Sequence, residues 1–305
     1  MNISIPLILL APMLFLPLIL TFGGLLLLKW SERRNVRRAP FDAKALRNQA
    51  GAQIRKQLED ATDGFWSVAA TALFAGPAIP LLIFTLEASF RSPEFISINV
   101  WIIALYLLTV GVGSTILIAQ ANRHLQVMRR CREGLAAECA TAQGLETLVP
   151  DGLMVFHDLP ADGFNIDHVV VGQGVVFAVE SKSRRKSSVS SKDSARVRYD
   201  GKTLRFPEHL ESKPLEQAAR QARWLADFLT GTTGNPVRVI PVLSLPGWYV
   251  ELTASIPTAS NDVRVINPKA PSFMRTVNFG PAMAEDQRRR IAWALTKRYG
   301  DQAED

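Results

Sequence analysis

Three long apolar runs, all within the first 120 of 305 residues, constrain this chain more than any other feature. The runs cover residues 3–28, 65–86 and 98–119. A helix needs roughly 20 apolar residues to cross the hydrocarbon core of a bilayer, so each run is long enough to span it. We therefore predict a membrane anchor of three transmembrane helices over residues 1–120, followed by a second domain over residues 121–305.

Other interpretations of these runs are open. A secretory signal peptide is the rival for the first run, but such a peptide carries its basic residues before a shorter apolar core. Here the basic cluster, from Lys29 to Arg38, follows the run. A pair of buried helices in a soluble protein is the alternative for the second and third runs. The central portions of the runs contain no Asp, Glu, Lys, Arg or His, which argues against a transporter or a channel.

The distribution of lysine and arginine predicts the orientation. Residues 29–63 carry nine of these side chains, whereas the short loop 87–97 carries only Arg91. The positive-inside rule then places the amino terminus outside, and the loop 29–63 and everything after Gln120 in the cytoplasm. We expect a multi-pass protein of a bacterial inner membrane, with the lipid bilayer as a partner. The net charge of +7 also favours anionic partners, either phospholipid headgroups or nucleic acid.

The sequence of the second domain predicts an α+β fold. Apolar residues at spacings of three and four predict an amphipathic helix over 121–147, and turn signals separate short strand-like runs after it. A second amphipathic helix is predicted over 215–229. The order is α-β-β-β-α-β, with a small mixed sheet. The predicted strands are 153–157, 166–171, 175–179 and 237–243, and beyond them we expect strands at 248–251 and 263–266 and a helix at 285–299.

Acidic residues and one lysine converge in this arrangement. Glu138 lies on or beside the apolar stripe of the first helix, where it is either a functional carboxylate or a rim glutamate that reaches water. Asp167 opens the second strand and Glu180 ends the third, so a tight antiparallel hairpin brings both to the same end. Lys182 follows Glu180 by two residues, on the same face.

These residue types suit metal-assisted phosphodiester hydrolysis. Carboxylate oxygens hold a hard cation such as Mg²⁺ or Mn²⁺, which neutralises charge on the scissile phosphate. The amine of Lys182 can orient the attacking water or help to deprotonate it. Without that lysine the same acids could form a passive metal site.

Several segments together carry a resemblance to a known family. They read Gly-Leu-Ala-Ala-Glu, Val-Phe-His-Asp-Leu, Asn-Ile-Asp-His-Val-Val-Val and Gly-Val-Val-Phe-Ala-Val-Glu-Ser-Lys, beginning at Gly134, Val155, Asn165 and Gly174. Over about 121–245 the chain resembles the nuclease-related domain family, NERD, of the PD-(D/E)xK nuclease superfamily. The resemblance implies a restriction-endonuclease-like core.

The resemblance also implies roles for individual residues. Glu138, Asp167 and Glu180 match the acidic positions and would be the metal ligands, Lys182 matches the lysine, and Gln217 matches a glutamine on the following helix. Serine stands at position 181 where threonine is common in the family.

A basic insertion over 183–206 departs from the family pattern. From Lys182 to Arg205 there are nine basic and two acidic residues, with a predicted hairpin that turns at Asp200-Gly201. Such a segment could follow phosphates, with Tyr199 or Phe206 stacking on bases, or could be a solvated loop or a surface facing anionic lipid. The predicted nucleic-acid-binding residues are Arg184, Arg185, Lys186, Lys192, Arg196, Arg198 and Lys202.

Two functions from different classes follow from these patterns. The first is a membrane-tethered, Mg²⁺-dependent or Mn²⁺-dependent nuclease that hydrolyses phosphodiester bonds of DNA or RNA at the cytoplasmic face. The second is a catalytically inactive, membrane-anchored scaffold that binds nucleic acid or a protein.

Overall fold

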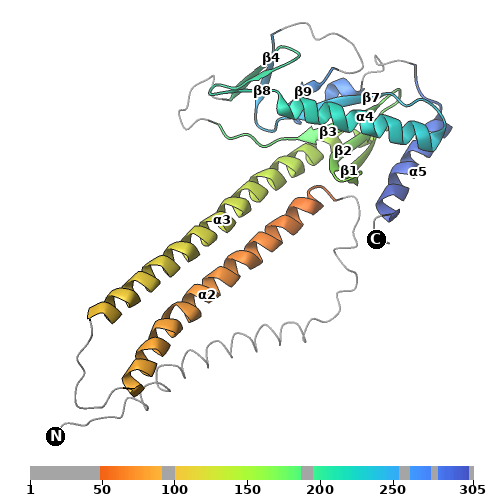
Figure 1. Ribbon diagram of the computed structural model, residues 1–305. Coiled ribbons are helices and arrows are strands. Elements are labelled where there is room, and N and C mark those ends of the chain that lie inside the picture. Colours follow the sequence, from red (N-terminus) through yellow and green to blue (C-terminus); the bar gives the residue numbers. More distant parts are fainter. Residues whose placement is uncertain (1–48, 91–99, 187–194, 254–261, 276–280, 302–305) are drawn as a thin grey trace. The chain divides into compact units, whose positions relative to one another are not determined.

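The computed structural model describes residues 49–90, 100–186, 195–253, 262–275 and 281–301 (Figure 1). Within these ranges the chain divides into two compact units. One unit comprises the described residues from 58 to 129, and the other comprises those up to 57 and from 130 onward.

Two long helices, α2 (Ala52–Phe90) and α3 (Val100–Glu146), supply the first unit. They approach closely at Gly64, where an added Cβ atom would lie 2.3 Å from the imidazole of His124. We predicted separate helices over 98–119 and 121–147, but α3 continues without interruption past residue 120. The segment around residue 120 contains no proline, and its residues are compatible with a helix.

The structure gives no support for the predicted three-span anchor. Among the residues whose side chains the structure describes, no helical stretch combines the length and the apolar composition that crossing a membrane requires. The first predicted span, 3–28, and residues 73–90, which include much of the second, lie outside that set.

The second unit is built on a mixed five-stranded sheet in the order β1-β2-β3-β7-β9. The first three strands form an antiparallel meander, and β7 and β9 continue the sheet in parallel to β3. The strands are β1 (Met154–Pro160), β2 (Asn165–Val171), β3 (Val176–Ser181), β7 (Val239–Ser244) and β9 (Arg264–Ile266).

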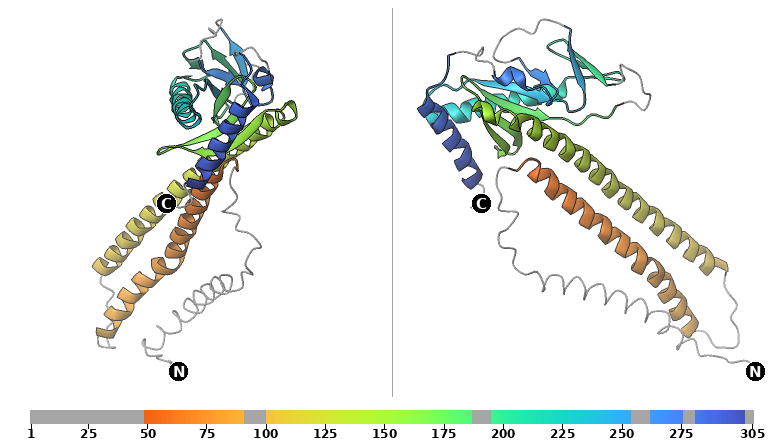
Figure 2. Two further views of the ribbon diagram at one scale, coloured as in Figure 1. Left: turned by 90° about the vertical axis from the view of Figure 1, so that its right-hand side faces the viewer. Right: turned by 180° about the vertical axis from the view of Figure 1, so that it is seen from behind.

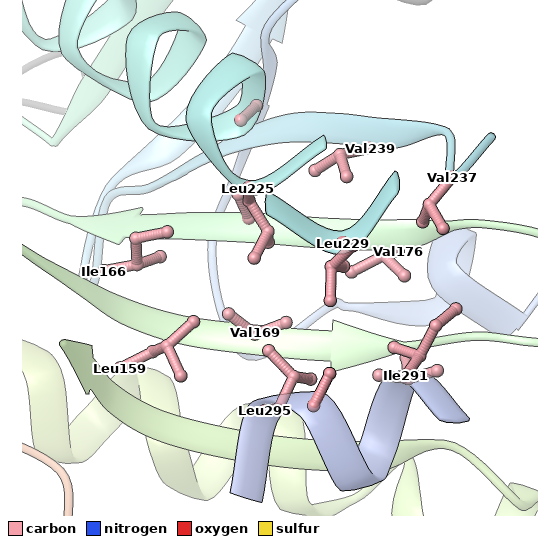
Figure 3. Packing of buried hydrophobic residues seen from close by; sticks show 14 residues of the cluster. Leu159, Ile166, Val169, Val176, Leu225, Leu229, Val237, Val239, Ile291 and Leu295 are labelled. Carbon is pink, nitrogen blue, oxygen red and sulfur yellow. The ribbon is translucent and has the colours of Figure 1, made fainter. Parts of the chain in front are cut away.

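Helices α4 (Lys213–Thr233) and α5 (Glu285–Asp301) pack against one face of this sheet (Figures 1 and 2). Figure 3 shows Leu225 and Leu229 of α4 and Leu295 of α5 directed at the β-strand side chains, and all three are fully buried. The spacing of buried residues along α4 is that of an amphipathic helix, which explains why the pattern predicted it correctly.

The opposite face of the sheet is covered by the end of α3 and by short 3₁₀ helices. Leu145 and Leu148 pack there against Phe177 and Val179, together with Met274. The 3₁₀ helices are η2 (Val149–Asp151) and η3 (Ser272–Arg275). Both faces of β3 are therefore buried, which is why its sequence reads as a continuous apolar run.

A second, four-stranded sheet has the order β6-β5-β4-β8. Its strands are β4 (Arg196–Tyr199), β5 (Leu204–Arg205), β6 (Leu210–Glu211) and β8 (Tyr249–Leu252). The predicted hairpin at Asp200-Gly201 is confirmed, since β4 and β5 pair across it.

The predicted order α-β-β-β-α-β is confirmed by α3, β1, β2, β3, α4 and β7. Strands β4, β5 and β6 are inserted between β3 and α4, so the basic insertion is a folded sheet in its described part.

The core packing leads to a first prediction. Leu225→Ala removes a fully buried side chain between α4 and the main sheet and should lower the free energy of unfolding by about 2–5 kcal/mol. Leu252→Ala, at an exposed site of β8, is the matched control and should change it by less than about 0.5 kcal/mol. Chemical denaturation followed by circular dichroism measures both, and equal losses would contradict the assigned core.

Candidate active site

Strands β2 and β3 bring two of the predicted acids together. The register of these strands pairs His168 with Val179, and the next positions outward are Asp167 and Glu180. Asp167 also accepts a hydrogen bond at Oδ2 from the backbone N–H of Ser181, with a distance of 2.6 Å. The predicted convergence of Asp167 and Glu180 at one end of the hairpin is confirmed.

Glu138 of α3 is the third acid of the cluster. It is buried, with 8% of its surface exposed, and its pKa is raised to about 7 by burial and then by the charges of Asp158 and Glu180. The backbone N–H of Gly51 donates a hydrogen bond that acts in the opposite direction. Glu138 is therefore a core-facing carboxylate rather than a rim glutamate.

The pKa of Asp167 is also raised well above its usual range. Burial is the main cause, and the charges of Glu180 and Glu138 add to it, while the Ser181 hydrogen bond and Lys182 oppose it. Each of the three carboxylates thus lies within electrostatic reach of another. The Ser181 hydrogen bond and the charge of Lys182 therefore do not fully offset the repulsion among the three carboxylates.

Glu180 differs from the other two acids because its carboxylate has direct partners. Gln217 donates to Oε1 at 2.8 Å and Gln221 donates to Oε2 at 2.6 Å. The ammonium of Lys182 forms an ion pair with Oε1. The structure therefore brings together all five residues that we predicted to be catalytic, with Gln217 in contact with Glu180 and Lys182 on the same face.

Two contributors were not among the predicted site residues. Gln221 lies one helical turn after Gln217 on α4, so the i, i+4 spacing was the available signal. Asp158 has a positive φ of 51°, accepts hydrogen bonds from Asn165 (2.7 Å) and from the backbone of Gln53 (3.0 Å), and raises the pKa of Glu138. The position of Asp158 depends on an irregular backbone conformation, which the periodicity of the sequence does not indicate.

His168, beside Asp167, is engaged with His157 of the neighbouring strand. Their Nδ1 atoms lie 2.8 Å apart, so one donates to the other. Burial and the neighbouring His157 lower the pKa of His168 to about 3, which keeps this imidazole neutral. This pairing gives His168 a structural role beside Asp167.

The donors present fit a hard divalent cation held by few protein ligands. The described part of the chain contains no group of three or more His, Cys, Asp or Glu side chains arranged to hold a metal. Mg²⁺ does not require one, since it is commonly bound by one or two carboxylates together with water and substrate phosphate. Asp167 Oδ1 accepts no hydrogen bond from the described residues, and a bound cation would offset the repulsion that raises the pKa values of Asp167 and Glu138.

Most of the predicted nucleic-acid-binding residues are engaged with carboxylates. Arg184 forms a two-point ion pair with Glu211, Arg185 forms one with Glu133, and Glu251 is shared by Arg196 and Arg198. Lys186 and Lys202 are exposed, and Lys192 lies outside the described residues.

The expectation that Tyr199 or Phe206 stacks on bases is wrong. Tyr199 is fully buried and Phe206 is 4% exposed, and both belong to the apolar cluster beneath the second sheet. Alternation along β4 turns Tyr199 inward and its arginine neighbours outward.

The mixed α+β fold and the acid-and-lysine cluster are consistent with a nuclease-like core. Residues 133–246 match the family model described as the nuclease-related domain, NERD, which supports the resemblance found in the sequence. The matched region includes every residue of the cluster described above except Gln53 and Gly51. No curated protein and no solved structure matches the chain significantly.

The raised pKa of Glu138 predicts how stability depends on pH. The folded state holds this proton up to about pH 7, whereas an unfolded glutamate releases it near 4.5, so stability falls as the pH rises between these values. Glu138→Gln removes the buried charge and should raise the free energy of unfolding at pH 8 by up to about 3 kcal/mol, with little gain at pH 5.

Denaturation in EDTA at both pH values measures this gain. Glu216→Gln, at an exposed position of α4, is the control and should leave the difference between the two pH values unchanged. If Glu138→Gln changed the free energy of unfolding by the same amount at pH 8 and at pH 5, the result would contradict a raised pKa for Glu138 in the folded state.

Proposed function

We propose that this protein is a metal-dependent nuclease that hydrolyses phosphodiester bonds of DNA or RNA at the cluster of Glu138, Asp167, Glu180 and Lys182. The observation that carries the proposal is the placement of Asp167 and Glu180 at neighbouring positions of β2 and β3 beside the ammonium group of Lys182. The match of the surrounding region to the nuclease-related domain supports a nuclease-related function.

Asp167 and Glu138, with Glu180 beside them, would hold Mg²⁺ or Mn²⁺. When bound, the cation would neutralise charge on the scissile phosphate and lower the pKa of a coordinated water. Asp167 has a carboxylate oxygen available for this role, and the Ser181 backbone N–H holds the other oxygen in place. Glu138 must release a proton whose pKa lies near 7, so ligand charge increases around neutral pH.

Lys182 would act next to the phosphate. Its Nζ atom is held by Glu180, and the side chain is still 26% exposed, so the amine is accessible from solvent. From that place it can orient an attacking water or stabilise charge on a phosphate oxygen. The two glutamines fix the Glu180 carboxylate and thereby the position of the amine.

A scaffold without catalytic activity is the second candidate, and one observation favours it. Glu180 already has three partners, and four predicted phosphate-binding arginines are paired with carboxylates. Such a site could bind without turnover. Micromolar binding of Mg²⁺ or Mn²⁺ in calorimetry, abolished by Asp167→Asn, would count against this second candidate.

We also infer a membrane tether for this activity, supported only by the apolar runs and the distribution of basic residues in the sequence. The full-length chain should remain in the membrane pellet after washing with alkaline carbonate. Added protease should then cleave the second domain only from the cytoplasmic side. Release of the chain into the wash would refute the tether and leave the proposed chemistry untouched.

The catalytic proposal has a direct test. Full-length protein purified in mild detergent should cleave nucleic acid when Mg²⁺ or Mn²⁺ is added, and EDTA should stop it. Asp167→Asn and Lys182→Ala should each lower the cleavage rate by at least about 100-fold. Gel assays on single-stranded and double-stranded substrates measure this rate.

Matched controls are available in the same domain. Asp227→Asn and Lys297→Ala change exposed residues of α4 and α5 and should leave cleavage intact. Equal rates for wild type, Asp167→Asn and Lys182→Ala would identify a contaminating nuclease and refute the assigned site.

A further inference from the structure

The outer face of the second sheet is basic and carries an exposed aromatic ring. Residues that are paired in register on neighbouring strands lie on the same face of a sheet. The outer face therefore contains three such pairs: Arg196 with Tyr249, Arg198 with Glu251 and Arg198 with Arg205. We name this surface the arginine face; its residues are Arg196, Arg198, Arg205, Leu210, Tyr249 and Glu251.

The two sides of this sheet differ sharply. The inner side chains Val197, Tyr199 and Leu204 are fully buried against the core. On the outer side, Tyr249 is 63% exposed and Leu210 is 59% exposed. The sheet is therefore held by its inner side, and the arginine face contributes little to that packing.

Positive charge predominates among the described residues of the arginine face. Arg196 and Arg198 both form ion pairs with the carboxylate of Glu251, at 3.3 Å and 3.2 Å. The side chain of Arg205 is exposed and forms no ion pair with the described residues. The described residues of this face thus carry three guanidinium groups and one carboxylate, and this excess of positive charge is complementary to phosphates.

Tyr249 adds a stacking surface to this charge. The guanidinium of Arg196 lies 5.1 Å from the centroid of its ring, so a planar cation and a ring lie together on an exposed strand. Bases of a single strand stack on such groups, whereas bases inside a duplex are already stacked on one another. A lipid headgroup would use the charge but not the ring plane.

The sheet that carries the arginine face is also connected to the candidate active site. Glu211 lies on β6, the edge strand of this sheet, and is paired with Arg184. The charge of Lys182 helps to lower the pKa of Glu211, so the two side chains are within electrostatic reach. Edge strand β6 of this sheet thus lies close to the lysine of the site, with Glu211 opposite Leu204 on the inner side of the sheet.

We propose that the arginine face binds single-stranded nucleic acid, with Tyr249 stacking on a base and Arg198 and Arg205 contacting phosphates. The choice of nucleic acid as the ligand rests on the proposed function, which this inference deepens by naming the class of substrate. Binding at this face does not require the metal or the carboxylate cluster.

Fluorescence anisotropy of a labelled thymidine oligonucleotide, with the full-length protein in EDTA, tests the proposal. Tyr249→Ala should weaken binding about tenfold or more, and Tyr249→Phe, which keeps the ring, should retain it. Arg205→Ala should weaken binding and reduce the slope of log affinity against log salt by about 0.7. A duplex of the same length should bind more weakly and respond little to Tyr249→Ala.

Trp293→Ala is the matched control. This tryptophan is 61% exposed and has Lys297 at 5.3 Å from its ring centroid, but it lies on α5. Equal loss for Trp293→Ala and Tyr249→Ala, or no loss for Tyr249→Ala, would overturn the proposal. The proposal would also be overturned if binding to phosphatidylserine vesicles depended on Tyr249 and Arg205 and binding to the oligonucleotide did not.

The result can be separated from the test of catalysis. A chain that binds the oligonucleotide through Tyr249 and never cleaves it would refute the proposed function and support this inference. Metal-dependent cleavage with oligonucleotide binding unaffected by Tyr249→Ala would refute the inference alone.

Discussion

The antiparallel pairing of β2 with β3 is the constraint on which the candidate site depends. Both faces of β3 are buried, so a slip of one residue would exchange the side chains directed at its two core clusters. The same register brings Asp167 opposite Glu180 and directs Glu180 toward α4, where Gln217 and Gln221 lie. The apolar core thus positions the polar cluster at its edge.

The electrostatics of that cluster are unequal. Glu180 is compensated by Lys182 and two amide donors, whereas Glu138 and Asp167 have raised pKa values. Burying an uncompensated carboxylate destabilises a folded protein, and apolar residues at such positions would remove this cost. A bound cation or substrate would offset this destabilising repulsion. For that reason we favour a catalytic role for the cluster over a purely structural one.

Periodicity in the sequence predicted the elements that depend on burial. The order of elements α-β-β-β-α-β, the hairpin at Asp200-Gly201 and helix α4 followed from alternation, turn residues and the apolar stripe. The same logic placed Asp167 and Glu180 together, because both are fixed by their strands. The nuclease-related resemblance supplied Gln217, and the geometry agrees with it.

Residues whose positions depend on tertiary context could not be predicted in this way. Asp158 reaches the cluster from a left-handed backbone conformation, and its effect on Glu138 is visible only once α3 and β1 are packed. The basic insertion was predicted to follow phosphates, to be a solvated loop or to face anionic lipid, but folding pairs several of its arginines with carboxylates, such as Arg185 with Glu133. Composition gives the charge of a segment and not the identity of the partners that neutralise it.

The second sheet shows how this α+β core accommodates additional strands without disturbing the candidate site. Its strands enter after Lys182 and leave before α4, and the inner residues join the core through Trp248 and Leu245. Only that inner side is constrained by packing, so the outer side is free to vary in charge and aromatic content. Selection on ligand binding can therefore act on the outer side separately from selection on the carboxylate cluster. An exposed tyrosine among arginines is therefore informative, because with 63% of its surface exposed it contributes little to the packing of the core.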